Sequence, residues 1–172
     1  MNVQPKILLW GMALAALSCL PSCPCVDCDY EYGSYEPIYM TRAALEASVR
    51  FVPAMPLSEP GKIYVRTTQL FICEPYKGVH VIDNSDPRNP RATDFIAIPG
   101  CVDIAVLNNI LYADNAVDLV AVDLEKREEV AREQNAFDGI ASPDGWWAGN
   151  SEEGTGKIIV GFTKKKRKEN RY

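Results

Sequence analysis

The sequence predicts an all-β fold built from two to three antiparallel repeats, and three observations lead to this prediction. From Gly61 onward apolar side chains recur with a period of two, as at Ile63 and Val65, which is typical of half-buried strands. The short strand-like runs are separated by turns rich in Gly, Pro, Asn and Asp. The whole pattern then starts again after 40–41 residues. These features predict a β-repeat domain over residues 61–163.

The most regular unit is Gly78–Pro90, which reads GVHVIDNSDPRNP. It begins as a strand, because β-branched residues such as Val81 and Ile82 suit a pleated, half-buried surface. Asp83 ends that strand, and Asp86 lies in the turn that follows. Short carboxylates bond to the backbone of their own turn, so we expect a structural role for both side chains.

A second copy of this unit follows, and a third is weaker. Lys157–Thr163 (KIIVGFT) matches Val117–Asp123 and would be the corresponding strand of a third copy that starts near Phe137. The period and the strand content are typical of one blade of a β-propeller. The first two copies align Ile63 with Ile104, Val65 with Val106, Leu70 with Leu111 and Phe71 with Tyr112 at 41 residues, and Asp83 with Asp123 at 40 residues.

The central unit resembles the LVIVD-repeat family of bacterial β-propeller proteins. The resemblance covers about residues 61–135, with a weaker extension to Thr163, and it implies a fold without implying an activity. The second copy departs from the pattern, since residues 125–127 replace the Ser-Asp-Pro turn. The matching residues are Gly78, Val81, Ile82, Asp83, Asp86, Pro87, Asn89 and Pro90, and in the second copy Leu119, Val120, Val122 and Asp123.

The number of repeats predicts an incomplete propeller. Propellers usually close with four to eight blades, and this chain of 172 residues has room for two or three. Three explanations stay open. The chain is a shortened or truncated member of a longer family, or several copies close a ring as a homo-oligomer, or the blade units form a compact sandwich of two sheets.

The N-terminus resembles a lipoprotein signal peptide over residues 1–18. Lys6 precedes an apolar run from Ile7 to Leu17 that is short for a membrane span and typical of a signal sequence. The residues before Cys19 resemble a bacterial lipobox, which implies that Cys19 is acylated and attaches the chain to a membrane. Cys23 is the alternative, although Pro21 fits that position poorly. A plain secreted protein is the other interpretation.

Residues 19–40 are expected to form an acidic tether, with an edge segment as the alternative for Asp29–Tyr39. Residues 41–60 are expected to hold one short helix, with Thr41 as its N-cap and Ala43–Arg50 as its body, followed by a Pro-rich linker. Residues 164–172 form a basic tail. Without that tail the body is clearly acidic, which argues against nucleic acid as a partner.

The sequence shows no catalytic constellation, no cofactor motif and no metal site. His80 is the only histidine, and we expect it to be half-exposed on a strand. A calcium site at Asp83, Asn84 and Asp86 is a weaker alternative to the structural turn. The CPCVDC cluster lacks the second ligand pair of a zinc site. Cys73 and Cys101 are expected to be small buried residues.

The best binding candidates are Trp146 and Trp147. In a strand adjacent side chains face opposite ways, so one of the two indoles is expected to be exposed. An exposed tryptophan anchors a protein partner or a sugar ring. The sequence therefore predicts a non-catalytic lipoprotein of the cell envelope, at the outer membrane, that acts as a binding or scaffolding module. The alternative is a subunit or fragment of a larger propeller enzyme or sensor whose site is completed elsewhere.

Overall fold

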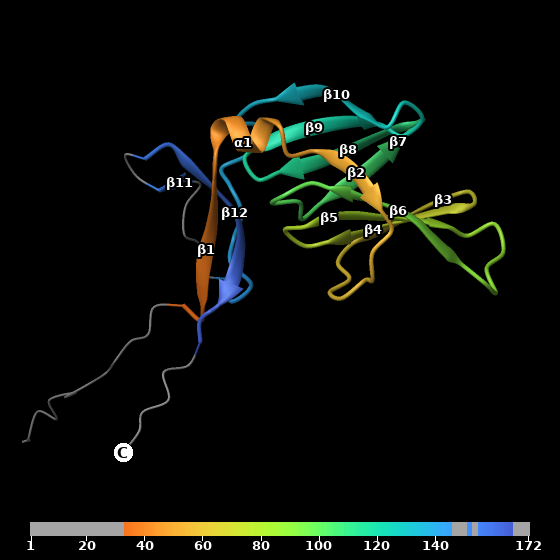
Figure 1. The fold of residues 1–172 in the computed structure, drawn as a ribbon, viewed down its shortest axis with the longest axis horizontal. Helices are drawn as coiled ribbons and strands as arrows, with labels where there is room; N and C mark the ends of the chain where they lie inside the picture. The colour runs from red at the N-terminus through yellow and green to blue at the C-terminus, as the bar shows by residue number, and fades with distance from the viewer. Residues whose placement is uncertain (1–32, 146–150, 153–154, 167–172) are drawn as a thin grey trace, which may run out of the picture. The chain divides into compact units, whose positions relative to one another are not determined.

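The computed structural model describes residues 33–145, 151–152 and 155–166. These residues form antiparallel β-structure in three sheets, none of which closes on itself (Figure 1). The all-β prediction is therefore confirmed. The described residues include no helix that is long and apolar enough to cross a membrane.

The first sheet has five strands in the order β2-β6-β5-β4-β3. Four of these strands lie where the alternating pattern predicts strands. The fifth, β2, lies in a stretch that we expected to be the end of a helix and the start of a linker. The strands are β2 (Arg50–Pro53), β3 (Ile63–Arg66), β4 (Gln69–Glu74), β5 (Gly78–Asp83) and β6 (Arg91–Ala97).

The second sheet has four strands in the order β10-β9-β8-β7, and it repeats the pairing of the first. Leu70 lies opposite Ile82 in the first sheet, and their repeat equivalents Leu111 and Val122 lie opposite each other in the second. The turn at residues 75–77 is one residue longer than its counterpart at 116–117, which explains why the repeat offset falls from 41 to 40. The strands are β7 (Ile104–Leu107), β8 (Ile110–Asn115), β9 (Asp118–Asp123) and β10 (Glu128–Glu133).

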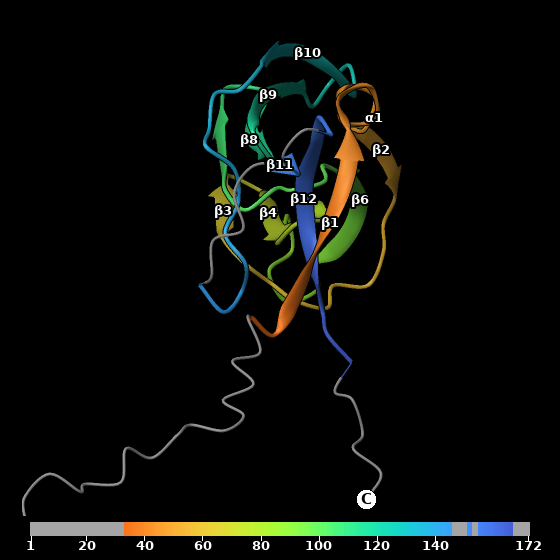
Figure 2. The same cartoon turned by 90° about the vertical axis from the view of Figure 1, so that its left-hand side faces the viewer.

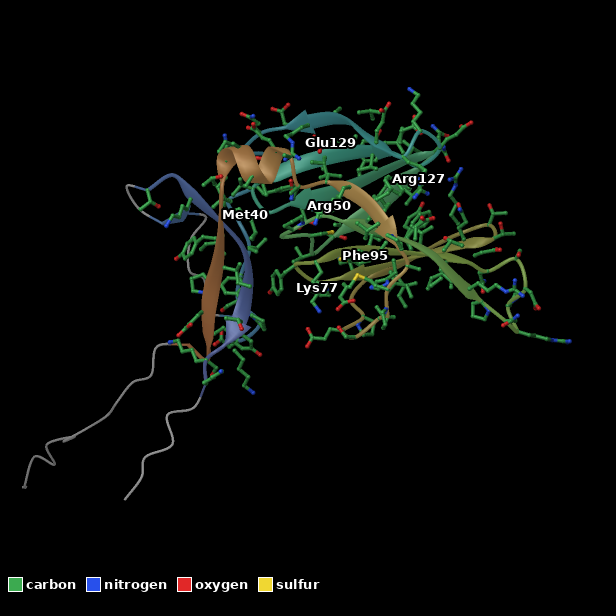
Figure 3. All side chains as sticks on the ribbon, in the orientation of Figure 1. Met40, Arg50, Lys77, Phe95, Arg127 and Glu129 are labelled. Carbon is green, nitrogen blue, oxygen red and sulfur yellow. The ribbon has the colours of Figure 1, made fainter. Side chains whose placement is uncertain are left out.

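The first two sheets pack face to face around a shared apolar core (Figure 1). Arg127, labelled in Figure 3, connects their edges: its guanidinium carbon lies 4.4 Å from the Phe51 ring centroid, and a guanidinium nitrogen lies 2.8 Å from the Asp94 carboxylate. This arrangement matches the sandwich explanation. The core side chains are Phe71, Cys73, Val79, Val81, Ile96, Ile98, Cys101, Val106, Leu111, Ala113, Val120 and Val122.

The third sheet joins the two ends of the described chain in the order β1-β12-β11 (Figure 2). It consists of β1 (Tyr35–Thr41), β12 (Lys157–Lys164) and β11 (Ser151–Glu152). We expected residues 35–40 to belong to the tether, and the structure differs there. Pairing with β12, in which Tyr35 lies opposite Lys164, gives this segment its strand conformation, in agreement with the alternative of an edge segment.

The third sheet packs against the helix and the β8–β9 turn. Its apolar side chains Ile158 and Val160 form a small core with Leu45, Ala116 and Val117. A further contact brings the rings of Tyr76 and Phe162 to a centroid distance of 5.5 Å. The third sheet therefore covers turns of the sandwich.

A five-residue helix, α1 (Arg42–Glu46), follows β1. Thr41 is its N-cap, because the Thr41 hydroxyl accepts a hydrogen bond of 3.2 Å from the Ala44 amide. The expected extension to Arg50 is absent. Val49 and Phe51 pack against the sandwich core, and Arg50 already pairs with Ala97, so sheet pairing ends the helix early.

Candidate docking surface

The two equivalent sheets use opposite faces in the sandwich. Side chains alternate across a strand, so each sheet has one face toward the shared core and one outer face. The first sheet turns the face that carries Phe71 and Val79 toward the core. The repeat equivalents of these residues are Tyr112 and Leu119, and they lie on the outer face of the second sheet. The face that the first sheet buries in the core is therefore equivalent to the outer face of the second sheet.

The outer face of the second sheet is apolar and accessible within the described part of the chain. Leu107 is 63% exposed and Tyr112 is 36% exposed, and Phe137 beside the sheet is also exposed. Ala105, Ala121 and Ala131 add small apolar side chains between them, as the strand register requires. Contiguous apolar surface of this kind marks a site of interaction more often than scattered single residues do.

Two adjoining hollows lie on this face. The larger has a volume of about 240 Å³, and its lining includes Tyr112, Leu119 and Phe137. The smaller has a volume of about 170 Å³ and lies between Ala121, Ala131 and the same two residues Tyr112 and Leu119. Pockets that enclose small-molecule ligands usually measure roughly 300–1,000 Å³. These hollows are of a size to accept single side chains of a partner surface.

Two carboxylates lie at one end of the larger hollow, and both already have partners. Asp114 accepts hydrogen bonds of 2.8 Å from the Val102 and Asp103 amides, and burial raises the pKa of Asp114. Asp103 forms an ion pair with Lys62, whose hydrogen bond lowers the pKa of Asp103. The carboxylates therefore organise the entry into β7, while the apolar side chains provide the contact surface.

The outer face of the first sheet is partly covered, although Ile63 and Val65 of the edge strand β3 stay exposed. Residues 54–62, which we call the strap, connect the edge strand β2 to the opposite edge strand β3. Ser58 of the strap donates a hydrogen bond to Glu74 on the outer face, and Lys77 Nζ lies 3.2 Å from the Ser58 hydroxyl. Figure 3 labels Phe95 of β6 and Lys77 of the β4–β5 turn. The strap thus lies on the outer face of the first sheet. The equivalent face of the second sheet forms part of the core.

Under the strap lies a buried pair, Glu74 and His80. His80 Nε2 lies 2.7 Å from the Glu74 carboxylate, and the His80 ring packs edge-on against Phe95 at a centroid distance of 4.7 Å. The expectation of a half-exposed His80 is wrong, since its exposed fraction is 1%. Burial alone would raise the pKa of Glu74, but hydrogen bonds with Lys77, Ser58 and His80 outweigh it and lower that pKa to about 2.

Asp83 and Asp123 end strands β5 and β9, Asp86 lies in a turn, and none of the three lines the two hollows of the docking surface. Asp83 accepts a hydrogen bond of 2.9 Å from the Ser85 amide, and Asp123 does the same with the Glu125 amide. Asp86 accepts one of 3.1 Å from the Arg88 amide. A hollow of about 230 Å³ adjoins Asp83 and Asp86, but it also contains the cation Arg91. Within the described ranges, no cluster of three His, Cys, Asp or Glu side chains is placed to hold a metal ion.

The remaining candidates from the sequence lie outside the described residues: Trp146, Trp147, Cys19 and Cys23. Tyr112, Leu119 and Phe137 were not predicted from the sequence to form a surface. The alignment of Phe71 with Tyr112 was a usable signal. It shows an aromatic side chain at the same position of both copies, and the third copy, which could cover the second, is weak.

The comparisons with known proteins add no relative. No protein-family model matches the chain, and neither the curated proteins nor the solved structures include a match.

Proposed function

We propose that this protein is a non-catalytic lipoprotein of the cell envelope whose β repeats act as a scaffolding module. The observation that carries the proposal is the accessible apolar outer face of the second sheet. In this proposal the N-terminal segment attaches the module to the membrane, and the outer face of the second sheet docks a protein partner. Relating the chain to LVIVD-repeat propellers is part of the same proposal, supported by the matched register of the two copies.

The non-catalytic assignment is supported by the way in which the buried titratable groups are used. Glu74 interacts with Ser58, Lys77 and His80 at once, and the His80 ring is packed against Phe95. A general base needs an accessible lone pair within reach of a substrate. A carboxylate with a pKa near 2 and three partners stabilises the strap in place and is a weak base.

The partner that fits the surface is a second copy of this chain, docked outer face to outer face. The internal sandwich offers a partial precedent, because the equivalent face of the first sheet packs against the aliphatic core face of the second sheet. Two-fold contacts of one surface with itself are the commonest in homo-oligomers. Charge also matches, because Glu133 lies at one end of the face and Lys126, which is 3.8 Å from Asp123, lies at the other, whereas Asp103 is already paired with Lys62. A two-fold axis across the strands brings these ends together.

The test is photo-crosslinking of the full chain in its host membrane. A photoreactive phenylalanine analogue at position 112 is expected to give a covalent dimer. The matched control carries the analogue at Ile63, which is 60% exposed on the first sheet, and is expected to give none. Crosslinks from position 112 to a different protein, or to nothing, overturn the second-copy assignment.

A further variant and a labelling experiment separate the docking from the anchoring. Tyr112→Glu is expected to abolish a dimer that is trapped by a surface-lysine crosslinker, because it places a charge in an apolar contact. Incorporation of a labelled fatty acid is expected in the wild type and lost in Cys19→Ala, with Cys23→Ala as the control. Unchanged labelling in Cys19→Ala contradicts the assigned lipid site and leaves the docking result unaffected.

A further inference from the structure

Two cysteines meet in the middle of the sandwich core. Cys73 of β4 and Cys101, which precedes β7, are both fully buried, and both belong to the apolar cluster that the first two sheets share. Their sulfur atoms lie 3.6 Å apart, although the residues are 28 positions apart in the chain. Each of the two side chains lies among other residues of this core.

The backbone holds the two cysteines together. The Tyr76 amide donates a hydrogen bond of 2.6 Å to the Cys101 carbonyl, and the Gly100 amide donates one of 3.0 Å to the Tyr76 carbonyl. Gly100 has a φ of +81°, and a Cβ at this position would lie 2.7 Å from the Cβ of Ala116. Glycine alone fits this close approach. The segment before Cys101 is thus docked on the β4–β5 turn, and the proximity of the sulfur atoms follows from the backbone.

We propose that Cys73 and Cys101 form an intramolecular disulfide when the chain folds in an oxidising compartment. The reaction is thiol–disulfide exchange with an oxidised dithiol protein or oxidised glutathione. One thiolate attacks the donor disulfide and forms a mixed disulfide, and the second thiolate displaces the donor thiol. In total two protons and two electrons leave the cysteine pair, and the donor disulfide is reduced to two thiols. This inference is independent of the docking surface and depends only on export.

The burial of the pair determines when the bond forms. The hydrogen bond with Cys73 and the burial of the side chain both raise the pKa of Cys101. Since the thiolate is the reactive species, the closed core disfavours both formation and reduction of the bond. The disulfide therefore forms before the two sheets close over the pair and afterwards resists reductants that leave the fold intact.

The location of the bond gives it a structural role between the repeats. Cys73 is in the first sheet, and Cys101 leads directly into the second through Asp103 and Ile104. A covalent link here would hold the start of the second copy against the first and restrict the unfolded chain. It would stabilise the shared core without using either outer face.

The test is peptide mapping of the full-length protein after refolding in a mixture of reduced and oxidised glutathione. Trypsin is expected to release residues 67–77 joined to residues 92–126 under non-reducing conditions. Neither peptide contains another cysteine, so this mass identifies the pair. Recovery of both peptides with alkylated free thiols overturns the proposal. Linkage of either peptide to the N-terminal cysteines overturns it as well.

Thermal unfolding provides the second measurement. Prolonged reduction in denaturant, followed by refolding with reductant, is expected to lower the Tm of the wild type by roughly 10 °C. The matched control is Cys73→Ala/Cys101→Ala, which keeps the N-terminal cysteines and is expected to give the same Tm with and without reductant. An equal shift in wild type and variant contradicts the assigned pair. If the variant does not fold, the peptide map of the wild type decides.

Discussion

The first and second sheets share a register and a repeat, yet their outer faces differ in what covers them. In the first sheet the strap crosses the outer face and buries Glu74 and His80. In the second sheet the outer face carries Leu107 and Tyr112 in accessible positions. The repeat therefore determines how the strands pair, whereas segments outside the repeat decide what covers each sheet.

The two sheets also differ in where they bury a carboxylate and in how that carboxylate is paired. In the first sheet the carboxylate is Glu74, the last residue of β4. The repeat equivalent of Glu74 is Asn115, and the buried carboxylate of the second sheet is Asp118, the first residue of β9. Asp118 accepts hydrogen bonds of 2.7 Å from both Arg42 and Arg132. The second sheet thereby attaches itself to α1.

The largest difference between the sheets is expected at the equivalent aromatic positions. Phe71→Ala should lower the free energy of unfolding by about 3–5 kcal/mol, because Phe71 is fully buried in the core and its loss leaves a cavity. Tyr112→Ala should cost about 1 kcal/mol or less in the monomer. Urea unfolding of both variants measures the difference. Equal losses would mean that Tyr112 is as buried as Phe71.

A second comparison concerns the ion pairs of Asp118. Asp118→Asn should destabilise the protein by about 3 kcal/mol, because Asp118 is fully buried between Arg42 and Arg132, and both cations would lose its charge. Glu129→Gln removes the other carboxylate that contacts Arg132, at a partly exposed position, and should cost less than about 1 kcal/mol. The same urea titration ranks the two variants, and a reversed order would contradict the buried role of Asp118.

The buried carboxylate of the first sheet makes a pH-dependent contribution. The folded-state pKa of Glu74, about 2, lies below its ordinary value of 4.5. A depressed pKa stabilises the fold above pH 4.5, and this stability is lost as the pH falls toward 2. On this account the free energy of unfolding should fall by about 3 kcal/mol between pH 5 and pH 2. Glu74→Gln should be less stable at pH 7 and should show a flatter pH dependence; an unchanged slope would falsify the assignment to Glu74.

The smallest effect is expected at the aspartates that end equivalent strands of the two sheets. Asp83, which is exposed, and Asp123, which is half-buried, both accept backbone hydrogen bonds at strand ends, and these bonds lower the pKa of each carboxyl. Asp83→Ala and Asp123→Ala should therefore behave alike, each within about 3 °C of the wild-type Tm. Differential scanning calorimetry checks this. A large loss in only one variant would show that the turns are not equivalent.

The sequence was sufficient to predict the strands of the two good copies. Alternation at Ile63 and Val65 and the matched aspartates locate strands because both signals are local. The sequence was insufficient for β1 and β2, whose conformations depend on distant partners: Tyr35 pairs with Lys164, and Arg50 pairs with Ala97. Intrinsic strand propensity predicts conformation poorly where pairing with a distant strand determines it.

The candidate surface was harder to predict than the strands. Alternation shows that Phe71 and Tyr112 belong to equivalent faces, but it does not show which face meets another sheet. His80 illustrates the same gap. Its position between Val79 and Val81 places it on the opposite face of the strand, but its burial depends on the strap and on Glu74, which no local pattern reveals.

The pairing of β1 with β12 has a consequence for how the chain acquires its structure. The paired residues are separated by 116 positions for Thr41 and Lys157 and by 129 for Tyr35 and Lys164. Contacts between such distant segments form slowly, because the intervening chain must first be ordered. The sandwich is complete in the chain before β12 has been synthesised. We therefore expect the third sheet to be the last part of the protein to assemble and the first to open, with β1 unpaired until β12 has been synthesised.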